Sequence, residues 1–541
     1  MTSSATYDLI IRRGTIFDGR GGMPFEGDLA IDGDRIVAVG ETGRAWGRKE
    51  IDADGMAVAP GFINMLSWAG EALLEDGRSQ SDIRQGVTLE VMGEGTSMGP
   101  LDEAMKEELK ARQSDVQYDI TWTTLREFLE ELVRRGVSPN VTSFVGATTV
   151  RIRQLGYADR PPTAAELAAM QSDVREAMEQ GAVGLSSALI YAPACYAGTA
   201  ELVSLARVVA EYEGLYISHI RNEGDRLLEA LEEFFAIVRQ AKVRGEIYHF
   251  KAAGLRNWPL LEQAIARIEE VRAEGLDVSA DMYTYAASST GLDAVMPAWV
   301  QEGGFDAWRE RLQDSEIRSR VRAEMESSDG DWENMFMATG PERMLLVGFR
   351  NKALRPLIGR TLADVAAERE TTPAETAMDL VVDDESRVQV VYHSMSEENV
   401  HRKVKLPWMS FGSDGRSLAA EGVFLRTSTH PRAYGNFARL LGRYVREEGL
   451  LPLQEAIRRL TSFPASRLNI AGRGLLAPGT FADVVIFDPH EIRDHATFET
   501  PHRYSTGVRD VLVNGVAVLR EGNHTGARPG RLVFGPGFRN L

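Results

Sequence analysis

Two histidines stand at equivalent places in two similar segments of the chain. His219 follows the apolar segment Leu215–Ser218, His249 follows Glu246–Tyr248, and each begins the pattern H-x-[KR]-x-x-G. Thirty residues separate the histidines, which is about the length of one unit made of a strand and its crossover helix. We therefore expect the two imidazoles to converge from neighbouring parallel strands, an arrangement that suits a metal site. Either histidine alone would more simply be a structural residue.

Two carboxylates follow other segments of the same kind. Glu94 comes after Val87–Met92, and Asp414 comes after Met409–Phe411. Two neutral imidazoles and one carboxylate make a three-ligand zinc site that leaves a position open for water, and a second carboxylate can then move protons. A lone acid in such a loop would more simply stabilise a turn. Taken together, the four residues predict a catalytic metal centre.

The segments that carry these residues belong to a repeating pattern. Short apolar runs rich in β-branched residues alternate with helical stretches, one of which begins at the capping sequence Thr163-Ala-Ala-Glu166. Such alternation predicts a parallel sheet with helical crossovers. About eight repeats favour an α/β fold with a (β/α)₈ TIM-like barrel, in which reacting groups lie at the carboxyl ends of strands. The predicted strands are Gly61–Met65, Val87–Met92, Asn140–Val145, Val183–Ser186, Leu215–Ser218, Glu246–Tyr248, Leu276–Met282 and Met409–Phe411, with a ninth segment, Val388–Tyr392, left unplaced.

Both ends of the chain have a different texture from its middle. Short strands separated by Gly-rich and Asp-Gly turns fill the first 60 residues and return near the C-terminus. We predict that residues 1–60 and 471–541 together form one small β module and that residues 61–470 form the barrel. Residues about 290–385 break the alternation of strands and helices, so we expect an insertion over the barrel mouth.

Composition limits the classes of partner. The chain has 541 residues, with 61 Lys plus Arg against 79 Asp plus Glu, for a net charge of −18. Such a surface repels nucleic acid and anionic membrane, so a small-molecule substrate is expected instead.

The single cysteine, Cys195, excludes an intrachain disulfide. The N-terminal residues lack a signal-peptide pattern and no apolar run reaches about 20 residues, so we predict a cytoplasmic protein.

Several longer motifs occur in one order along the chain. They are Ala59-Pro-Gly-Phe-Ile63, Ser218-His-Ile-Arg-Asn-Glu-Gly-Asp225, His249-Phe-Lys-Ala-Ala-Gly254, Asp281-Met-Tyr-Thr-Tyr-Ala-Ala-Ser-Ser-Thr290, Gly412-Ser-Asp-Gly415 and His430-Pro-Arg-Ala-Tyr-Gly435. In these motifs the chain resembles the D-aminoacylase (N-acyl-D-amino-acid deacylase) branch of the amidohydrolase superfamily. The resemblance implies a zinc-bearing barrel with a terminal β-sandwich, and metal-dependent hydrolysis of the amide bond of N-acyl amino acids, in particular N-acyl-D-amino acids.

The resemblance also implies roles for single residues. His219 and His249 match the metal-binding histidines of the family, and Asp414 matches its catalytic base. We also predict that Tyr191 contacts the substrate. The residues that resemble the contacts with the substrate carboxylate are Lys251, Tyr283, Ser289 and Arg432.

Two departures from the family pattern bear on the metal. The family usually carries H-x-H after Pro-Gly-Phe-Ile, but here those positions hold Leu66 and Trp68, which argues against a second metal ion. The family's metal-binding cysteine is also missing, and Glu94 takes its place if one residue is deleted in the alignment. Both ligand types are possible, because zinc binds carboxylate oxygen at about 2.0 to 2.2 Å and thiolate sulfur at about 2.3 Å.

These observations lead to the hypothesis of a mononuclear metalloamidase. Glu94, His219 and His249 would hold one divalent ion, expected to be zinc, and Asp414 would take a proton from the attacking water and pass it to the departing amine. The same site could instead hydrolyse another amide, a cyclic amide or an ester. Loss of the H-x-H pair could alternatively mark a non-catalytic scaffold descended from an enzyme.

Overall fold

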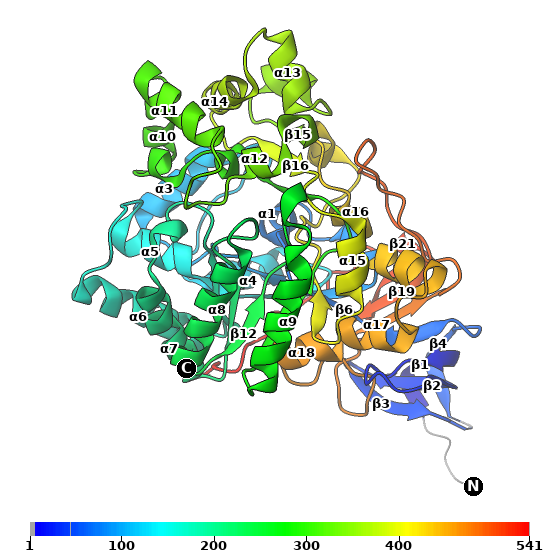
Figure 1. Cartoon of the computed structure of the whole chain (residues 1–541). Helices are drawn as coiled ribbons and strands as arrows, with labels where there is room; N and C mark the ends of the chain where they lie inside the picture. Colours follow the sequence, from blue (N-terminus) through cyan, green and yellow to red (C-terminus); the bar gives the residue numbers. More distant parts are fainter. Residues whose placement is uncertain (1–5, 44, 540–541) are drawn as a thin grey trace.

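The computed structural model describes residues 6–43 and 45–539 and has a mixed α/β fold. Figure 1 shows strands of the N-terminal part at one corner of the molecule and the helices of residues 305–384, α10 to α14, at the opposite side. Among the described residues, no helix has both the length and the apolar character that crossing a membrane requires.

Parallel strands make up the centre of the molecule. Three of them form one sheet in the order β6-β7-β8, and six form another in the order β17-β13-β12-β11-β10-β9. All eight predicted segments are confirmed as strands, and the segment Asn140–Val145 divides into two strands, β8 and β9. Their bounds are β6 (Phe62–Asn64), β7 (Val87–Met92), β8 (Asn140–Ser143), β9 (Val145–Gly146), β10 (Gly184–Ala188), β11 (Leu215–His219), β12 (Arg244–Ile247), β13 (Val278–Met282) and β17 (Met409–Phe411).

Hydrogen bonds also join the two parallel sheets to each other. On one side, Met65 N donates to Phe411 O at 3.3 Å, which links the end of β6 to β17. On the other side, Val183 N donates to Ser143 O at 3.1 Å, which links β8 to the start of β10. The carboxyl ends of these strands therefore share one rim, where their following loops meet.

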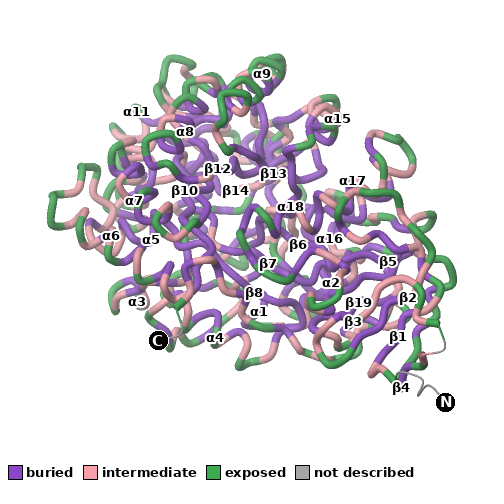
Figure 2. The backbone as a smooth tube through the Cα atoms, turned by 90° about the horizontal axis from the view of Figure 1, so that it is seen from below, coloured by how far each residue is buried: buried purple, intermediate pink, exposed green. Residues whose placement is uncertain are grey.

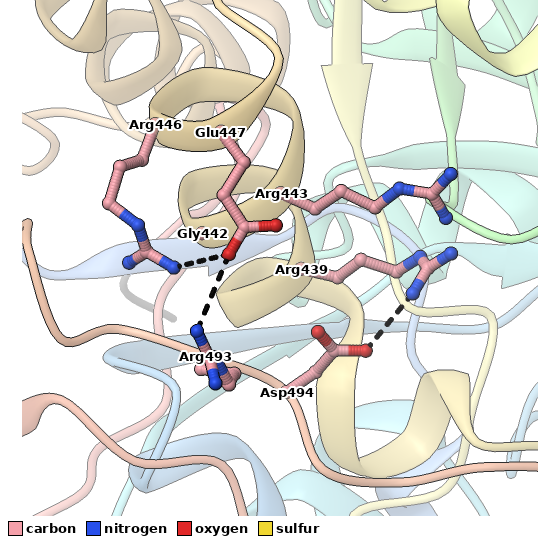
Figure 3. Close-up of a pocket in the computed structure, with 7 residues that line it drawn as sticks. All are labelled: Arg439, Gly442, Arg443, Arg446, Glu447, Arg493 and Asp494. Carbon is pink, nitrogen blue, oxygen red and sulfur yellow. Dashed lines mark hydrogen bonds and ion pairs between the residues drawn. The ribbon is translucent and has the colours of Figure 1, made fainter.

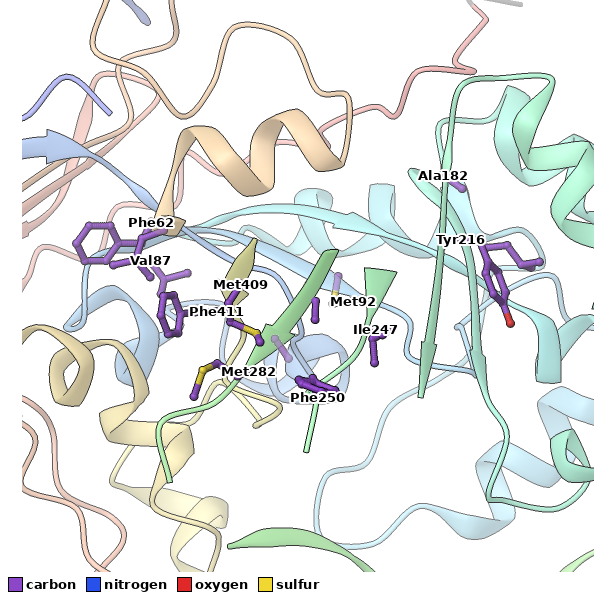
Figure 4. Packing of buried hydrophobic residues seen from close by; sticks show 14 of the residues in the cluster. Phe62, Val87, Met92, Ala182, Tyr216, Ile247, Phe250, Met282, Met409 and Phe411 are labelled. Atoms are coloured by element: carbon purple, nitrogen blue, oxygen red, sulfur yellow. The ribbon is translucent and has the colours of Figure 1, made fainter. Parts of the chain in front are cut away.

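The central strands are almost entirely buried, with side chains packed on both of their faces. Leu89, Val91 and Ile217 pack in one hydrophobic cluster, whereas Met92 and Ile247 belong to the main cluster that the surrounding helices cover. Figure 4 shows side chains of the main cluster along β6, β7, β12, β13 and β17. In Figure 2 the buried backbone concentrates around these strands and the exposed segments lie at the periphery.

Helices follow most of the central strands. The predicted capping sequence is confirmed, because Thr163 accepts from Glu166 N and Glu166 accepts from Thr163 N at the start of α6. The helices around the strands are α1 (Ala69–Glu75), α2 (Gln80–Ile83), α3 (Glu103–Arg112), α4 (Leu125–Arg135), α5 (Ala147–Leu155), α6 (Ala164–Glu179), α7 (Thr199–Ala210), α8 (Leu227–Ala241), α9 (Leu260–Ala273), α15 (Glu397–Val404), α16 (Arg432–Arg439), α17 (Leu453–Leu460) and α18 (Ser462–Arg467).

The two ends of the chain meet in a single nine-stranded sheet. Its strands are β1 (Thr6–Ile16), β2 (Phe25–Asp32), β3 (Arg35–Gly40), β4 (Trp46–Asp52), β5 (Ala57–Pro60), β18 (Val484–Phe487), β19 (Val508–Val513), β20 (Val516–Arg520) and β21 (Asn523–His524). The N-terminal and C-terminal strands join where β5 pairs antiparallel with β18. β4 was not predicted, because most of its residues are charged and exposed and give no apolar alternation.

The predicted insertion has a small sheet of its own. β14 (Ser288–Gly291), β15 (Met344–Gly348) and β16 (Gln389–Tyr392) pair antiparallel, and β16 is the ninth segment that the sequence left unplaced. A separate hydrophobic cluster packs this sheet against the insertion's helices. Those helices are α10 (Phe305–Arg311), α11 (Ser315–Met325), α12 (Met335–Thr339), α13 (Leu362–Glu368) and α14 (Pro373–Asp384).

Candidate metal centre

The predicted metal ligands lie together at the rim where the parallel strands end. Glu94 follows β7 by two residues, His219 ends β11, and His249 follows β12 by two residues. Glu94 Oε1 lies 3.1 Å from His219 Nδ1 and 3.0 Å from His249 Nε2. All three side chains are buried. Gly93 makes this possible because its φ of +95° turns the loop, and a Cβ there would lie 2.4 Å from Phe144 O.

The three donors fit a divalent cation. The ligand atoms lie within 4.8 Å of one another, and a tetrahedral site with bonds of about 2.0 to 2.2 Å places its ligand atoms roughly 3.4 Å apart. Two imidazoles and one carboxylate also match the donor set of catalytic zinc sites that keep one position open. The group therefore suits one zinc ion or a similar divalent cation.

A second glutamate, which the sequence analysis missed, lies behind the two imidazoles. Glu223 Oε2 is 3.3 Å from His219 Nε2, and Glu223 Oε1 is 3.1 Å from His249 Nδ1. The far nitrogen of each predicted ligand thus faces the same carboxylate, which fixes the nitrogens that point at Glu94. Carboxylates in this position orient metal-binding histidines in many proteins. The sequence signals for Glu223 are its place four residues after a histidine that ends a strand and its position inside the Ser218–Asp225 motif.

Charges within this cluster compensate each other. Burial raises the pKa of Glu223, but the positive charge of Lys251 and the two imidazoles lower it by more, so the net pKa lies well below its usual range. Burial lowers the pKa of His219, yet Glu223 and Glu94 raise it to about 10. The pKa of Glu94 is lowered overall, because the imidazoles outweigh the effect of burial. The carboxylates of Glu94 and Glu223 therefore hold positive charge close to the two imidazoles.

Asp414, the predicted base, follows β17 and lies near the predicted ligand Glu94, with the indole nitrogen of Trp68 between the two carboxylates. Its backbone has a φ of +47°, and its N donates to Leu66 O at 2.9 Å, so the loop after β17 is held against the end of β6. Asp414 Oδ2 forms an ion pair with Arg432 Nη1 at 2.8 Å. Burial raises the pKa of Asp414, although Arg432 opposes this. A raised pKa suits a group that accepts and then returns a proton.

The indole nitrogen of Trp68 lies between the carboxylates of Glu94 and Asp414. Its Nε1 lies 3.1 Å from Glu94 Oε2 and 3.1 Å from Asp414 Oδ1. The indole N–H therefore faces both carboxylates, and neither of the two hydrogen bonds was predicted from the sequence.

The predicted substrate contacts surround this centre, but several of them are engaged by protein groups. Arg432 lies 4.5 Å above the ring of Tyr283, whose hydroxyl has only Met395 Sδ, at 4.0 Å, as a partner among the described residues. Lys251 Nζ donates to both oxygens of Glu223 at 2.6 Å and is buried. Lys251 is thus held by Glu223 in this structure.

Two further predicted contacts lie towards the insertion. Tyr191 packs edge-on against the His219 ring at 5.5 Å and donates from its hydroxyl to Thr290 Oγ1 at 2.8 Å. Ser289 Oγ donates to Val390 O at 2.9 Å within the small antiparallel sheet. The insertion thus reaches the edge of the candidate site through β14.

Comparison with known proteins identifies the chain. The sequence profile of the amidohydrolase family matches residues 49–519. The chain is 32% identical to D-aminoacylase of Alcaligenes xylosoxydans xylosoxydans over 537 residues, which is 98% of each protein. This protein belongs to the amidohydrolase family. The predicted resemblance to the D-aminoacylases is confirmed.

Solved structures of the same branch are close to this amidohydrolase. One D-aminoacylase structure, described for its binuclear metal centre with "one-metal activation and second-metal attenuation", has 31% sequence identity and a TM-score of 0.81, and the match covers 98% of this chain and all of that one. An N-acyl-D-glutamate deacylase of Bordetella bronchiseptica, solved with zinc and a phosphonate inhibitor, has 31% identity and a TM-score of 0.79 over the same shares.

Two surface pockets of this amidohydrolase lie apart from the candidate centre. One, of about 270 Å³, adjoins the π-helical segment Leu440–Glu447 that continues α16. Figure 3 shows Arg439, Arg446 and Arg493 each paired with a carboxylate there. Glu447 and Asp494 each face an arginine there, so we interpret it as an ion-pair network. The other, of about 790 Å³, is lined by His393 and by residues of the insertion and the 498–503 segment. No predicted site residue lines either pocket.

Proposed function

We propose that this amidohydrolase cleaves the amide bond of N-acyl-D-amino acids with one divalent cation, zinc, held by Glu94, His219 and His249. The observation that carries the proposal is the buried convergence of these three donors at the strand ends of a chain that matches D-aminoacylases over nearly its full length. A cation at this position would polarise the scissile carbonyl and lower the pKa of the attacking water.

Asp414 is the proposed base in this reaction. One of its oxygens faces Trp68 and the other faces Arg432, so its carboxylate is held in one orientation. It accepts the proton of the attacking water and then gives it to the departing amine nitrogen. The raised pKa of Asp414, which results from burial, supports the second of these transfers.

Arg432 and Tyr283 are the proposed contacts for the carboxylate of the leaving amino acid. Their stacking and the weakly engaged Tyr283 hydroxyl support this role, and a guanidinium binds a carboxylate through two parallel hydrogen bonds. Tyr191 and Ser289 complete the proposed substrate contacts on the side of the insertion. The predicted contact between Lys251 and substrate stays a prediction, because Glu223 engages its ammonium group.

We also propose that β6 to β13 and β17 form a closed (β/α)₈ barrel over residues 61–470. The hydrogen bonds between β6 and β17 and between β8 and β10 support closure.

We propose further that residues 1–60 and 471–541 form a β-sandwich, since the Arg35–Phe481 bridge brings the β3 edge back to the start of β18. The cytoplasmic location and the absence of nucleic-acid and membrane partners stay predictions.

Metal analysis paired with initial rates tests the proposed function. We expect about one equivalent of zinc in the purified protein and turnover of N-acetyl-D-amino acids well above that of their L-forms and of hydantoins. Glu94→Ala and His219→Ala should lose both zinc and activity, whereas Glu107→Ala, at an exposed position in α3, should lose neither. Faster turnover of hydantoins would assign a cyclic-amide substrate. Little zinc and no turnover after zinc is added would indicate a scaffold.

A further inference from the structure

Trp68 occupies the space between the two carboxylates that the proposed reaction uses. Its Nε1 lies 3.1 Å from both Glu94 Oε2 and Asp414 Oδ1, while Glu94 Oε1 faces the two imidazoles. The two oxygens of Glu94 are therefore divided between the metal cluster and the indole. Trp68 as a whole is 44% exposed, so the residue also reaches solvent.

The backbone holds Trp68 and Asp414 as one unit. Trp68 N donates to Gly415 O at 2.9 Å, and Asp414 N donates to Leu66 O at 2.9 Å. These two bonds extend the contact between β6 and β17 beyond the ends of both strands. The indole and the Asp414 carboxylate consequently keep their relative position without help from a bound ion.

The indole N–H is well suited to separate two carboxylates. Two negative groups that share a small buried space repel each other, and the positive end of an N–H dipole between them reduces that repulsion. The same N–H would repel a cation that approached both oxygens, since its hydrogen points into the space such a cation would need. Leu66, buried and apolar, supplies no ligand atom beside it.

We propose that the indole N–H of Trp68 takes the place of a second metal ion, by joining Glu94 to Asp414 through hydrogen bonds and by excluding a cation from the space between them. Trp68 is thus a positioning residue that acts through Asp414. The proposal rests on the proposed function, which makes Glu94 a ligand and Asp414 the base. It assigns to this chain a site that binds one zinc ion and is not inhibited by excess zinc.

Zinc stoichiometry and steady-state kinetics of three variants test the proposal. Trp68→Phe keeps an aromatic ring but removes the N–H, and kcat should fall about 10- to 100-fold with little change in KM, as expected when a hydrogen bond to a charged group is lost. Trp68→His adds a ligand atom next to Glu94 and Asp414, so the protein should bind a second, weaker equivalent of zinc. Trp46→His, in an exposed position on β4, serves as the control and should bind one equivalent.

The outcomes separate this proposal from the proposed function. Two equivalents of zinc in the wild-type protein, or a single equivalent in Trp68→His even at excess zinc, would overturn the role of Trp68 and leave the deacylase proposal standing. An unchanged kcat in Trp68→Phe would overturn it as well. Conversely, one equivalent of zinc in wild type and two in Trp68→His, without turnover of any N-acyl amino acid, would refute the function while supporting the exclusion of a second ion.

Discussion

Glu223 receives two hydrogen bonds from the ammonium group of Lys251, each 2.6 Å long, and both side chains are buried. The same carboxylate faces the far nitrogens of His219 and His249. One buried acid therefore links a cation, two imidazoles and, through them, the proposed metal position. Replacing Glu223 should therefore have a different effect from replacing Lys251.

Glu223→Gln should weaken zinc binding about 10- to 100-fold, because an amide orients the imidazoles less firmly than a carboxylate and does not strengthen them as ligands. Competition with a chromophoric chelator gives the affinity directly. Glu107→Gln, which changes an exposed acid in α3, provides the matched control. Equal zinc affinities in the two variants would mean that Glu223 has no part in holding the histidines.

Lys251→Met should destabilise the fold by about 3 to 5 kcal/mol, since it leaves Glu223 as a buried negative charge without its partner. Urea unfolding monitored by circular dichroism measures the loss, and Lys110→Met, at an exposed position, should change stability little. A large increase in KM with unchanged stability would contradict this assignment. That result would instead support the predicted contact between Lys251 and the substrate.

The strands and the metal trio were predictable because their signals are local. The predicted ligands lie at or just after the ends of three short buried strands, β7, β11 and β12, as in the segment that ends at His219. Glu223 and Trp68 escaped prediction because their roles depend on distant partners, such as the loop after β17 that brings Asp414 to the indole. β16 could be recognised as a strand but not placed, since its antiparallel partners β14 and β15 are far away in the sequence.

Asp414→Asn should lower kcat about 100- to 10,000-fold while zinc content stays at one equivalent, because an amide cannot accept the proton of the attacking water. Arg432 would still find an oxygen at this position, so the loop should keep its structure. Metal analysis and rates measured on the same preparation separate the two effects. Asp119→Asn, at an exposed position, is the control. Loss of zinc in Asp414→Asn would instead assign Asp414 to the ligand set.

Lys403 gives the stability of the protein a pH dependence that can be tested. Its Nζ donates to Phe250 O at 2.7 Å, and burial, reinforced by the charge of Lys251, lowers its pKa to about 7. Because an unfolded lysine titrates near about 10.4, the unfolded state binds more protons between about pH 7 and pH 10.

Stability contributed by this group should therefore rise with pH across that window, by a few kcal/mol at most. Lys403→Met should flatten the rise, whereas Lys405→Met, two residues away and exposed, should retain it. Urea unfolding at pH 7, 8, 9 and 10 compares the three proteins, and the difference between the two variants isolates Lys403 from other groups that titrate in this range. Parallel curves for Lys403→Met and Lys405→Met would show that Lys403 stays charged in the folded protein.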